Sequence, residues 1–287
     1  MSGIRIAGTS QQVEELVRQW RESGLTVGFV PTMGALHRGH ISLVELALAE
    51  TDRVVVSIFV NPAQFGPGED LDSYPRTVPE DIDSLDGAGA HCVFLPAVSE
   101  IYPPGHSTTV KVSGLPESLC GRFRKGHFEG VTTVCAILFG IVRPDAAVFG
   151  KKDAQQLAVI RRMVRDLRLG VRIVAGDTVR EPDGLAMSSR NAYLGKEERI
   201  QAAVIHRALA EASAYVGSGG TGAEKIIETA RSIIREAPLA RIQYIELVDP
   251  ETMEPIRSLN PHGLLAVAVY FGDTRLIDNV TLETRGL

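Results

Sequence analysis

Two histidines, His37 and His40, stand three residues apart in a turn that also contains Gly34 and Gly39. Side chains at this spacing can lie side by side at the start of a helix, where each imidazole offers a hydrogen bond to a phosphate. The first backbone N–H groups of a helix lack partners within it and add further donors there. The spacing alone fits two interpretations equally well: a phosphate-binding turn, or a plain connection with exposed histidines.

The residues around this turn predict the elements that position it. An apolar run at 25–30 predicts a buried strand, and residues 41–50 predict a helix. The β-branched run at 53–60 predicts a second strand, and such runs are typical of parallel sheets covered by helices on both faces. Ligands of these sheets bind outside the carboxyl ends of the strands. Gln64 follows the second run, so it is either a solvated loop residue or a ligand contact.

The alternation of strand and helix continues to about residue 175 and predicts an α/β domain with a parallel sheet over residues 1–178. Residues 179–287 break the pattern, since a glycine-rich stretch at 217–222 separates two helices that precede strands. They predict a small α+β domain. The remaining expected strands are 91–95, 146–149, 172–175, 242–248 and 263–271, with 275–279 continuing the last; the expected helices are 11–23 (with Ser10 as N-cap), 79–85, 131–142, 154–167, 198–215 and 223–235.

Lysines mark a second junction between a strand and a helix. Lys151 and Lys152 follow the expected strand at 146–149, and a lysine in that place can reach a phosphate as a mobile positive charge. Farther on, Ser188–Arg190 carries two hydroxyls and a guanidinium. That segment fits either a polar loop that caps the next helix or a flexible segment that closes over a ligand.

Two charged clusters leave both a structural and a functional interpretation open. Glu80 and Asp81 fall in the first turn of an expected helix, where carboxylates either interact with the helix dipole or hold a divalent cation. The basic residues that precede the apolar helix at 131–142 fit equally well a solvated loop or contact with an anionic ligand. They are Arg122, Arg124, Lys125 and His127.

Composition excludes several classes of protein. The 287 residues are 44% hydrophobic and 23% charged, which is typical of a soluble globular protein. A net charge of −5 gives no general basic face, so we expect no nucleic-acid partner. We also expect no membrane partner, because the longest apolar stretch is shorter than the ~18 residues that a span needs. We expect no signal peptide, because the first ten residues lack a charged segment followed by an apolar one. The cysteines Cys92, Cys120 and Cys135 have no metal-ligand or redox spacing, which predicts a cytoplasmic protein.

Several segments, taken together and in order, resemble one family. The segment Pro31–His40 resembles the His-x-Gly-His signature of the nucleotidylyltransferase superfamily, and Met187–Asn191 resembles its mobile Lys-Met-Ser-Lys-Ser loop. With these two, the whole chain resembles the pantoate–β-alanine ligase family. The other matching segments are Ile58–Phe65, Tyr74–Thr77, Gly126–Phe128 and Lys152–Gln156.

The resemblance implies a Rossmann-like nucleotide-binding domain and a smaller C-terminal α+β lid domain. It implies ATP-dependent ligation of pantoate with β-alanine in two steps. Pantoate carboxylate first attacks the α-phosphate of ATP, which gives pantoyl adenylate and pyrophosphate. The amine of β-alanine then attacks the acyl group, which gives pantothenate and AMP. Mg²⁺ as a cofactor and a homodimer are implied as well.

The resemblance also implies residue roles. His37, His40, Lys152, Ser188, Ser189 and Arg190 would be catalytic, with His40 as the acid that assists the leaving group. Gln64 and Gln156 would bind pantoate, and Gln64 would also orient β-alanine. Arg124 and His127 would assist at the rim, and no metal ligand is assigned. ATP would contact Met33, Gly34, Ala35, Leu36, His37, Arg38, Gly39, His40, Gly150, Lys151, Lys152, Asp153, Val179, Met187, Ser188, Ser189 and Arg190.

One departure and two rival functions belong beside this hypothesis. The family usually has glutamate where this chain has Lys151, so Lys151 is given no catalytic role. The two-histidine turn and the Ser188–Arg190 loop alone also fit another adenylyl-transferring enzyme of the same superfamily. A non-catalytic nucleotide-binding module would keep the fold without the chemistry, and the joint presence of the histidines, Lys152 and the loop argues against it.

Overall fold

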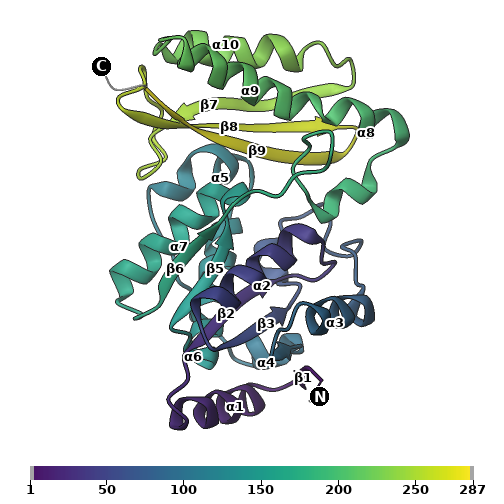
Figure 1. The fold of residues 1–287 in the computed structure, drawn as a ribbon, viewed down its shortest axis with the longest axis vertical. Helices are drawn as coiled ribbons and strands as arrows, with labels where there is room; N and C mark the ends of the chain where they lie inside the picture. The colour runs from purple at the N-terminus through teal and green to yellow at the C-terminus, as the bar shows by residue number, and fades with distance from the viewer. Residues whose placement is uncertain (1–2, 285–287) are drawn as a thin grey trace. The chain divides into compact units, whose positions relative to one another are not determined.

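The computed structural model describes residues 3–284 and resolves two compact units (Figure 1). The first unit comprises residues up to 113, 124–151 and 159–177, and the second comprises 114–123, 152–158 and the residues from 178 onward. The predicted division into a nucleotide-binding domain of residues 1–178 and a lid domain of residues 179–287 stays a prediction. None of the helices within the described residues combines the length and apolar character that a membrane span requires.

A six-stranded parallel sheet forms the first unit, with strand order β1-β4-β3-β2-β5-β6. The chain moves outward from β2 through β3 to β4 and returns on the other side of β2 to form β5. Ligands of open α/β sheets bind where the strand order reverses, which here is at the carboxyl ends of β2 and β5. The strands are β1 (Arg5–Ala7), β2 (Val27–Thr32), β3 (Arg53–Ile58), β4 (Cys92–Phe94), β5 (Ala146–Gly150) and β6 (Arg172–Gly176).

Helices cover this sheet because its central strands are apolar on both faces. Val30, Val54 and Val56 are fully buried, and Val44 and Ala47 of α2 pack in the same cluster. The first unit contains α1 (Ser10–Glu22), α2 (Arg38–Glu50), η1 (Pro62–Gln64), α3 (Val78–Gly87), α4 (Val98–Ile101) and α6 (His127–Val142). Each of η3 (Lys151–Asp153) and α7 (Ala154–Leu167) has some residues in the first unit and some in the second.

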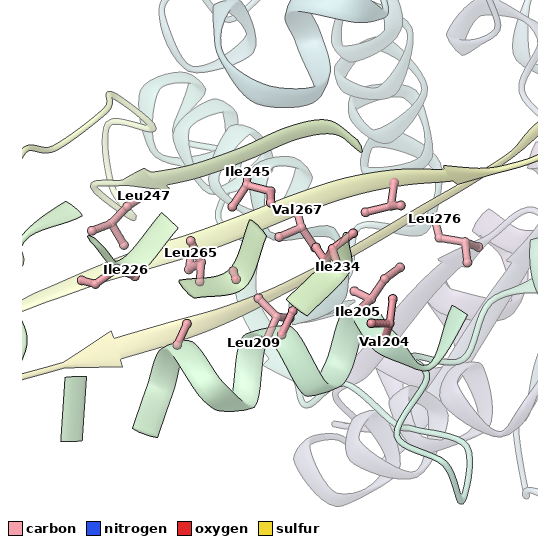
Figure 2. Close-up of a cluster of buried hydrophobic side chains, with 14 of the residues drawn as sticks. Val204, Ile205, Leu209, Ile226, Ile234, Ile245, Leu247, Leu265, Val267 and Leu276 are labelled. Atoms are coloured by element: carbon pink, nitrogen blue, oxygen red, sulfur yellow. The ribbon is translucent and has the colours of Figure 1, made fainter. Parts of the chain in front are cut away.

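The second unit is built on an antiparallel sheet of three strands, β7 (Ala240–Val248), β8 (His262–Phe271) and β9 (Thr274–Glu283). Figure 2 shows its core, where Leu209 and Ile226 of the helices face Leu265 and Val267 of β8. Its helices are η2 (Leu115–Glu117), α5 (Leu119–Phe123), η4 (Ser189–Tyr193), α8 (Lys196–Ala202), α9 (Val204–Gly217) and α10 (Ala223–Ile234).

The predicted fold class is confirmed: an α/β unit with a parallel sheet and a smaller α+β unit. Several details differ. Strand β1 was not predicted, because three residues are too short to show an alternating pattern. Helix α2 begins at Arg38 rather than 41, which places both histidines at its start. The helix expected at 198–215 is two helices, α8 and α9, that meet at Ala203.

The predicted N-cap of α1 is wrong by one residue. Thr9, not Ser10, caps the helix: its hydroxyl accepts the Gln12 N–H at 3.3 Å, and the Gln12 amide oxygen accepts the N–H groups of Gly8 and Thr9. The Ser10 hydroxyl instead donates to Glu100 at 2.5 Å. Two adjacent hydroxyl residues could each serve as the cap, and the glutamine three positions after Thr9 completes a capping box with Thr9 alone.

We therefore expect Thr9→Ala to destabilise α1 by about 1 kcal/mol, the usual contribution of an N-cap side chain. Native-state hydrogen exchange of the α1 amides measures this as exchange about fivefold faster. Thr9→Ser is the matched control, because it keeps the capping oxygen and should retain protection. Equal protection in the alanine variant would refute the assignment of this cap.

Candidate active site

The turn after β2 adopts a backbone conformation that glycine favours. Gly34 has φ +84°, and a Cβ there would lie 3.0 Å from the Ile58 side chain and 3.1 Å from the Asp81 carboxylate. Ala35 follows with φ +50°, which also lies in the left-handed region although this residue carries a Cβ. Two successive left-handed residues turn the chain sharply from the sheet into α2.

A buried carboxylate holds this turn. Asp81 in the first turn of α3 is 2% exposed, and its two oxygens accept the N–H groups of Ala35 at 2.9 Å and Leu36 at 2.8 Å. The Thr77 hydroxyl also donates to this carboxylate at 3.2 Å. Both oxygens thus accept hydrogen bonds from the chain itself, which supports the structural role of Asp81.

The two imidazoles are tied to the same turn by their Nδ1 atoms. His37 is the N-cap of α2, and its Nδ1 accepts the Gly39 N–H at 3.1 Å. The Nδ1 of His40 accepts the His37 N–H at 3.3 Å, and the ring centroids are 4.1 Å apart. A neutral ring whose Nδ1 accepts carries its proton on Nε2. Each half-buried ring therefore presents an N–H donor on its other side.

These contacts correct one expectation about the turn. The sequence predicted unpartnered backbone N–H groups that face a phosphate. The structure instead pairs the N–H groups of Ala35 and Leu36 with Asp81, and those of His37 and Gly39 with the imidazoles. Four backbone N–H groups of the turn are therefore already bound within the chain.

Gln64 lies beside this turn rather than in a solvated loop. Its side chain is 9% exposed, its amide nitrogen is 3.2 Å from the Met33 sulfur, and its amide oxygen accepts from Asn61 at 3.2 Å. Asn61 is the N-cap of η1 and also accepts the Tyr102 hydroxyl at 2.8 Å. The amide predicted to bind a hydroxy acid is therefore oriented beside the histidine turn.

A charged network supports the backbone of Gln64. Arg124 forms a bidentate pair with Glu69 at 2.8 and 2.5 Å and approaches His127 Nε2 at 3.1 Å. His127 Nδ1 lies 2.9 Å from the Gln64 carbonyl oxygen, so an Nδ1–H tautomer donates to that carbonyl while Nε2 accepts from Arg124. Burial raises the pKa of Glu69, but the hydrogen bonds and charge of Arg124 outweigh it and hold this pKa below its usual value.

The residues of the predicted basic cluster are divided between the two units. Arg124 and His127 belong to the first unit, whereas Arg122 belongs to the second and pairs there with Glu246. Lys125 is exposed. The two residues expected to assist at a rim, Arg124 and His127, are thus the two that support Gln64.

The lysine junction divides between the units. Lys151, in the first, forms an exposed ion pair with Asp177 at 2.6 Å, which water screens strongly. Lys152, in the second, is half-buried, and its carbonyl accepts the Asn279 amide at 2.9 Å. Gln156 is half-buried on α7, whereas its neighbour Gln155 is buried and binds the carbonyls of Leu115 and Ser118. Gln155 therefore anchors the 114–123 segment.

The Ser188–Arg190 segment begins a short helix, η4. Ser188 caps it by accepting the Arg190 N–H at 3.3 Å. The Met187 N–H donates to the Val179 carbonyl at 3.0 Å, which brings together two of the predicted ATP contacts. Arg180, which follows Val179, forms a bidentate pair with the buried Asp278 at 2.6 and 3.1 Å. This segment is thereby fixed to β9 within the second unit.

The predicted ATP contacts form two groups, each within one unit. Contact of both groups with one ATP stays a prediction. The first unit holds Met33, Gly34, Ala35, Leu36, His37, Arg38, Gly39, His40, Gly150 and Lys151; the second holds Lys152, Asp153, Val179, Met187, Ser188, Ser189 and Arg190.

The described residues contain neither a clustered set of metal ligands nor an exposed thiol. No cluster of three or more potential metal ligands from His, Cys, Asp and Glu exists among residues 3–284. All three cysteines are buried and unpaired, and burial raises the pKa of Cys92 and Cys135 to about 12. Their interpretation as small buried hydrophobic residues is confirmed.

Comparison with known proteins decides the family. The model of a family described as pantoate-beta-alanine ligase matches residues 5–281. This chain belongs to the pantoate–β-alanine ligase family. The pantothenate synthetase of Koribacter versatilis is 50% identical over 283 residues, which cover 99% of this chain and 97% of that protein. That of Thermotoga neapolitana is 49% identical over 279 residues, or 97% of this chain and all of the relative.

Solved ligases share the fold. The pantothenate synthetase of Thermus thermophilus has a TM-score of 0.91 at 45% identity, with 96% of this chain and 99% of that chain covered. The Francisella tularensis pantoate–β-alanine ligase, complexed with beta-gamma ATP and β-alanine, has a TM-score of 0.80 at 33% identity, with 96% and 97% covered. The resemblance seen in the sequence is confirmed, and the chain is a ligase that joins pantoate to β-alanine.

Sequence reasoning missed four residues that shape this ligase site. Asn61, Glu69 and Gln155 received no role, and Asp81 was not linked to the histidine turn. Asn61 had a signal, since it directly precedes Pro62 as an N-cap residue should. Glu69 and Gln155 had none, because their partners lie 55 and up to 40 residues away in sequence.

Helix α6 touches η1 so closely that only glycine fits at the contact. A Cβ on Gly130 would lie 2.3 Å from the Ala63 carbonyl oxygen and 2.7 Å from the Gln64 Cα. We expect Gly130→Ala to displace Gln64, to raise the KM for pantoate and to lower the melting temperature, because over-packing typically costs about 1–3 kcal/mol.

Gly140 in the same helix is the matched control, since a Cβ there meets nothing within 4 Å. Gly140→Ala should keep the KM and raise stability by up to ~1 kcal/mol through helix propensity. Steady-state kinetics and thermal unfolding of both variants test the contact. An unchanged pantoate KM in Gly130→Ala would contradict the coupling of α6 to Gln64.

Proposed function

We propose that this ligase makes pantothenate through a pantoyl adenylate. Pantoate carboxylate attacks the α-phosphorus of ATP, and the bond to the bridging oxygen of pyrophosphate breaks. The amine of β-alanine then attacks the acyl carbon and loses a proton as AMP leaves. The observation that carries this proposal is the pair of Nε2–H donors on His37 and His40 at the carboxyl end of β2, beside the amide of Gln64.

The histidines supply donors to the phosphate oxygens. Phosphoryl transfer loads negative charge onto those oxygens, and catalysis consists mainly of positioning and of fixed donors that meet that charge. His37 and His40 suit this role because backbone contacts at Nδ1 fix the direction of each Nε2–H. His40 donates to the leaving pyrophosphate. Met33, Arg38 and the rest of the turn line the nucleotide.

The substrate acid requires groups that both donate and accept. Gln64 and Gln156 provide amides for the carboxylate and hydroxyls of pantoate without adding a competing negative charge. Gln64 also orients the amine of β-alanine. The His127–Arg124–Glu69 network supports this assignment for Gln64, since it holds the residue by its backbone carbonyl and not by its side-chain amide.

The second unit contributes its own ATP contacts in this proposal. Lys152 neutralises phosphate charge, Val179 meets the adenine through its backbone, and Ser188, Ser189 and Arg190 cover the triphosphate. Gly150, Lys151 and Asp153 border the nucleotide. Covering the site keeps water from the labile acyl adenylate. The hydrogen bond from Met187 to Val179 supports a shared role for these positions.

Mg²⁺, when bound with ATP, would neutralise phosphate charge. We assign its binding chiefly to the phosphate oxygens of ATP, which is usual for this ion, because the buried carboxylate of Asp81 is occupied by backbone donors. The proposal extends to a cytoplasmic homodimer, consistent with three unpaired cysteines. Light scattering of the purified protein tests the dimer.

Pantoate-dependent exchange of pyrophosphate into ATP tests the substrate. We expect exchange with pantoate and none with a panel of amino acids or other carboxylic acids, since the amides of Gln64 and Gln156 are assigned to a hydroxy acid. Formation of pantothenate and AMP on adding β-alanine completes the assay. Exchange that depends on an amino acid and not on pantoate would assign the chain to the rival class of adenylyl-transferring enzymes.

His40→Ala tests the chemistry. We expect a folded protein whose pantoate-dependent exchange rate falls about 10²–10³-fold, the usual effect of removing one fixed donor to a developing negative charge. His262→Ala is the control, because His262 is an exposed imidazole at the start of β8 with no role in this proposal. Unchanged turnover in His40→Ala would remove its catalytic role.

A further inference from the structure

Asp81 is a buried acidic residue whose two carboxylate oxygens both accept hydrogen bonds from the histidine turn. Burial of a carboxylate costs free energy unless hydrogen bonds compensate it. Here the donors are two consecutive backbone N–H groups and the Thr77 hydroxyl. These hydrogen bonds fix the position of the carboxylate and, at the same time, the backbone of the turn.

The backbone of the turn needs such a partner. Ala35 at φ +50° lies in a region that is unfavourable for a residue with a Cβ, and such a conformation persists only where its surroundings determine it. Successive N–H groups in a turn of this kind form a concavity that binds anions. The carboxylate of Asp81 occupies that concavity.

The same concavity is where a phosphate of ATP would otherwise bind. With Asp81 in it, the N–H groups of Ala35 and Leu36 are not available to a ligand, and the negative charge nearby disfavours a phosphate there. The peptide of Leu36 leads directly to His37, whose N–H and ring are both tied to the start of α2. A displacement of the turn therefore moves both imidazoles together.

We propose that Asp81 is a positioning residue: it fixes the histidine turn and, by filling the turn's anion-binding concavity, directs the phosphates of ATP to the Nε2–H groups of His37 and His40. This proposal rests on the phosphate-binding roles given above to those histidines. It assigns no cation to Asp81.

Asp81→Asn is the sharpest test, because the amide matches the carboxylate in shape. Its oxygen can still accept one N–H, whereas its nitrogen faces the other N–H with a donor. We expect kcat for pantoate-dependent exchange to fall 10- to 100-fold with a smaller change in the KM for ATP, as for residues that orient catalytic groups. Asp83→Asn on the same helix changes the same charge at an exposed position and should leave kcat unchanged.

A double-mutant cycle with His40→Ala separates positioning from an independent role. If Asp81 acts through the imidazoles, Asp81→Asn lowers kcat much less in the His40→Ala background than in the native protein. Additive losses would overturn the proposal. So would a rise in the Mg²⁺ concentration needed for half-maximal rate that matched the loss in kcat, because that result would make Asp81 a cation ligand.

Ring ¹⁵N chemical shifts of His37 and His40 in the ligand-free protein provide a readout independent of turnover. We expect the shifts of an Nε2–H tautomer in the native protein and altered Nδ1 shifts in Asp81→Asn, and unchanged shifts would refute the positioning role. Should Asp81→Asn fail to fold, Thr77→Val removes one hydrogen bond to the carboxylate and should produce a smaller change in the same shifts. Native protein with these shifts but no pantoate-dependent exchange would count against the proposed function alone.

Discussion

The placement of β2 in the middle of a parallel sheet is the constraint on which the site depends. β2 pairs with β3 on one side and β5 on the other, so the chain cannot leave it sideways and must turn out of the sheet at its carboxyl end. Gly34 and Ala35 make that turn within two residues, and α2 begins at Arg38. The same geometry leaves a position at the switch point of the sheet where a nucleotide can bind.

The hydrogen bonds of this turn divide the work between backbone and side chains. The backbone N–H groups are used internally, by a buried carboxylate and by two ring nitrogens. Because Nδ1 of each imidazole accepts a backbone N–H, a neutral ring carries its proton on Nε2. This arrangement differs from glycine-rich phosphate loops, in which the backbone itself meets the anion. In the proposed site, the imidazole side chains take that role, and their backbone contacts set the direction of donation before any ligand arrives.

The sequence predicts the fold better than it predicts the residues that support the histidine turn and Gln64. Hydrophobic runs and glycine-containing turns located nearly all strands and helices, because each run reports its own burial. The motifs around His37, Gln64 and Ser188 were also readable, since each is local. The contacts of Asp81 with Ala35 and of Arg124 with Glu69 join residues 46 and 55 positions apart. Such pairs leave no periodic signal, and the positive φ of Ala35 has none either.

The three cysteines, described above as buried hydrophobic residues, also determine how the protein meets reactive reagents. Their sulfurs lie inside the two units, and the high pKa of Cys92 and Cys135 keeps those two thiols protonated at neutral pH. Oxidants and alkylating agents thus find few nucleophilic sulfurs on the folded chain. A single cysteine introduced at an exposed position would consequently be labelled selectively by a maleimide dye, which makes the native sequence a ready background for fluorescence studies of its motions.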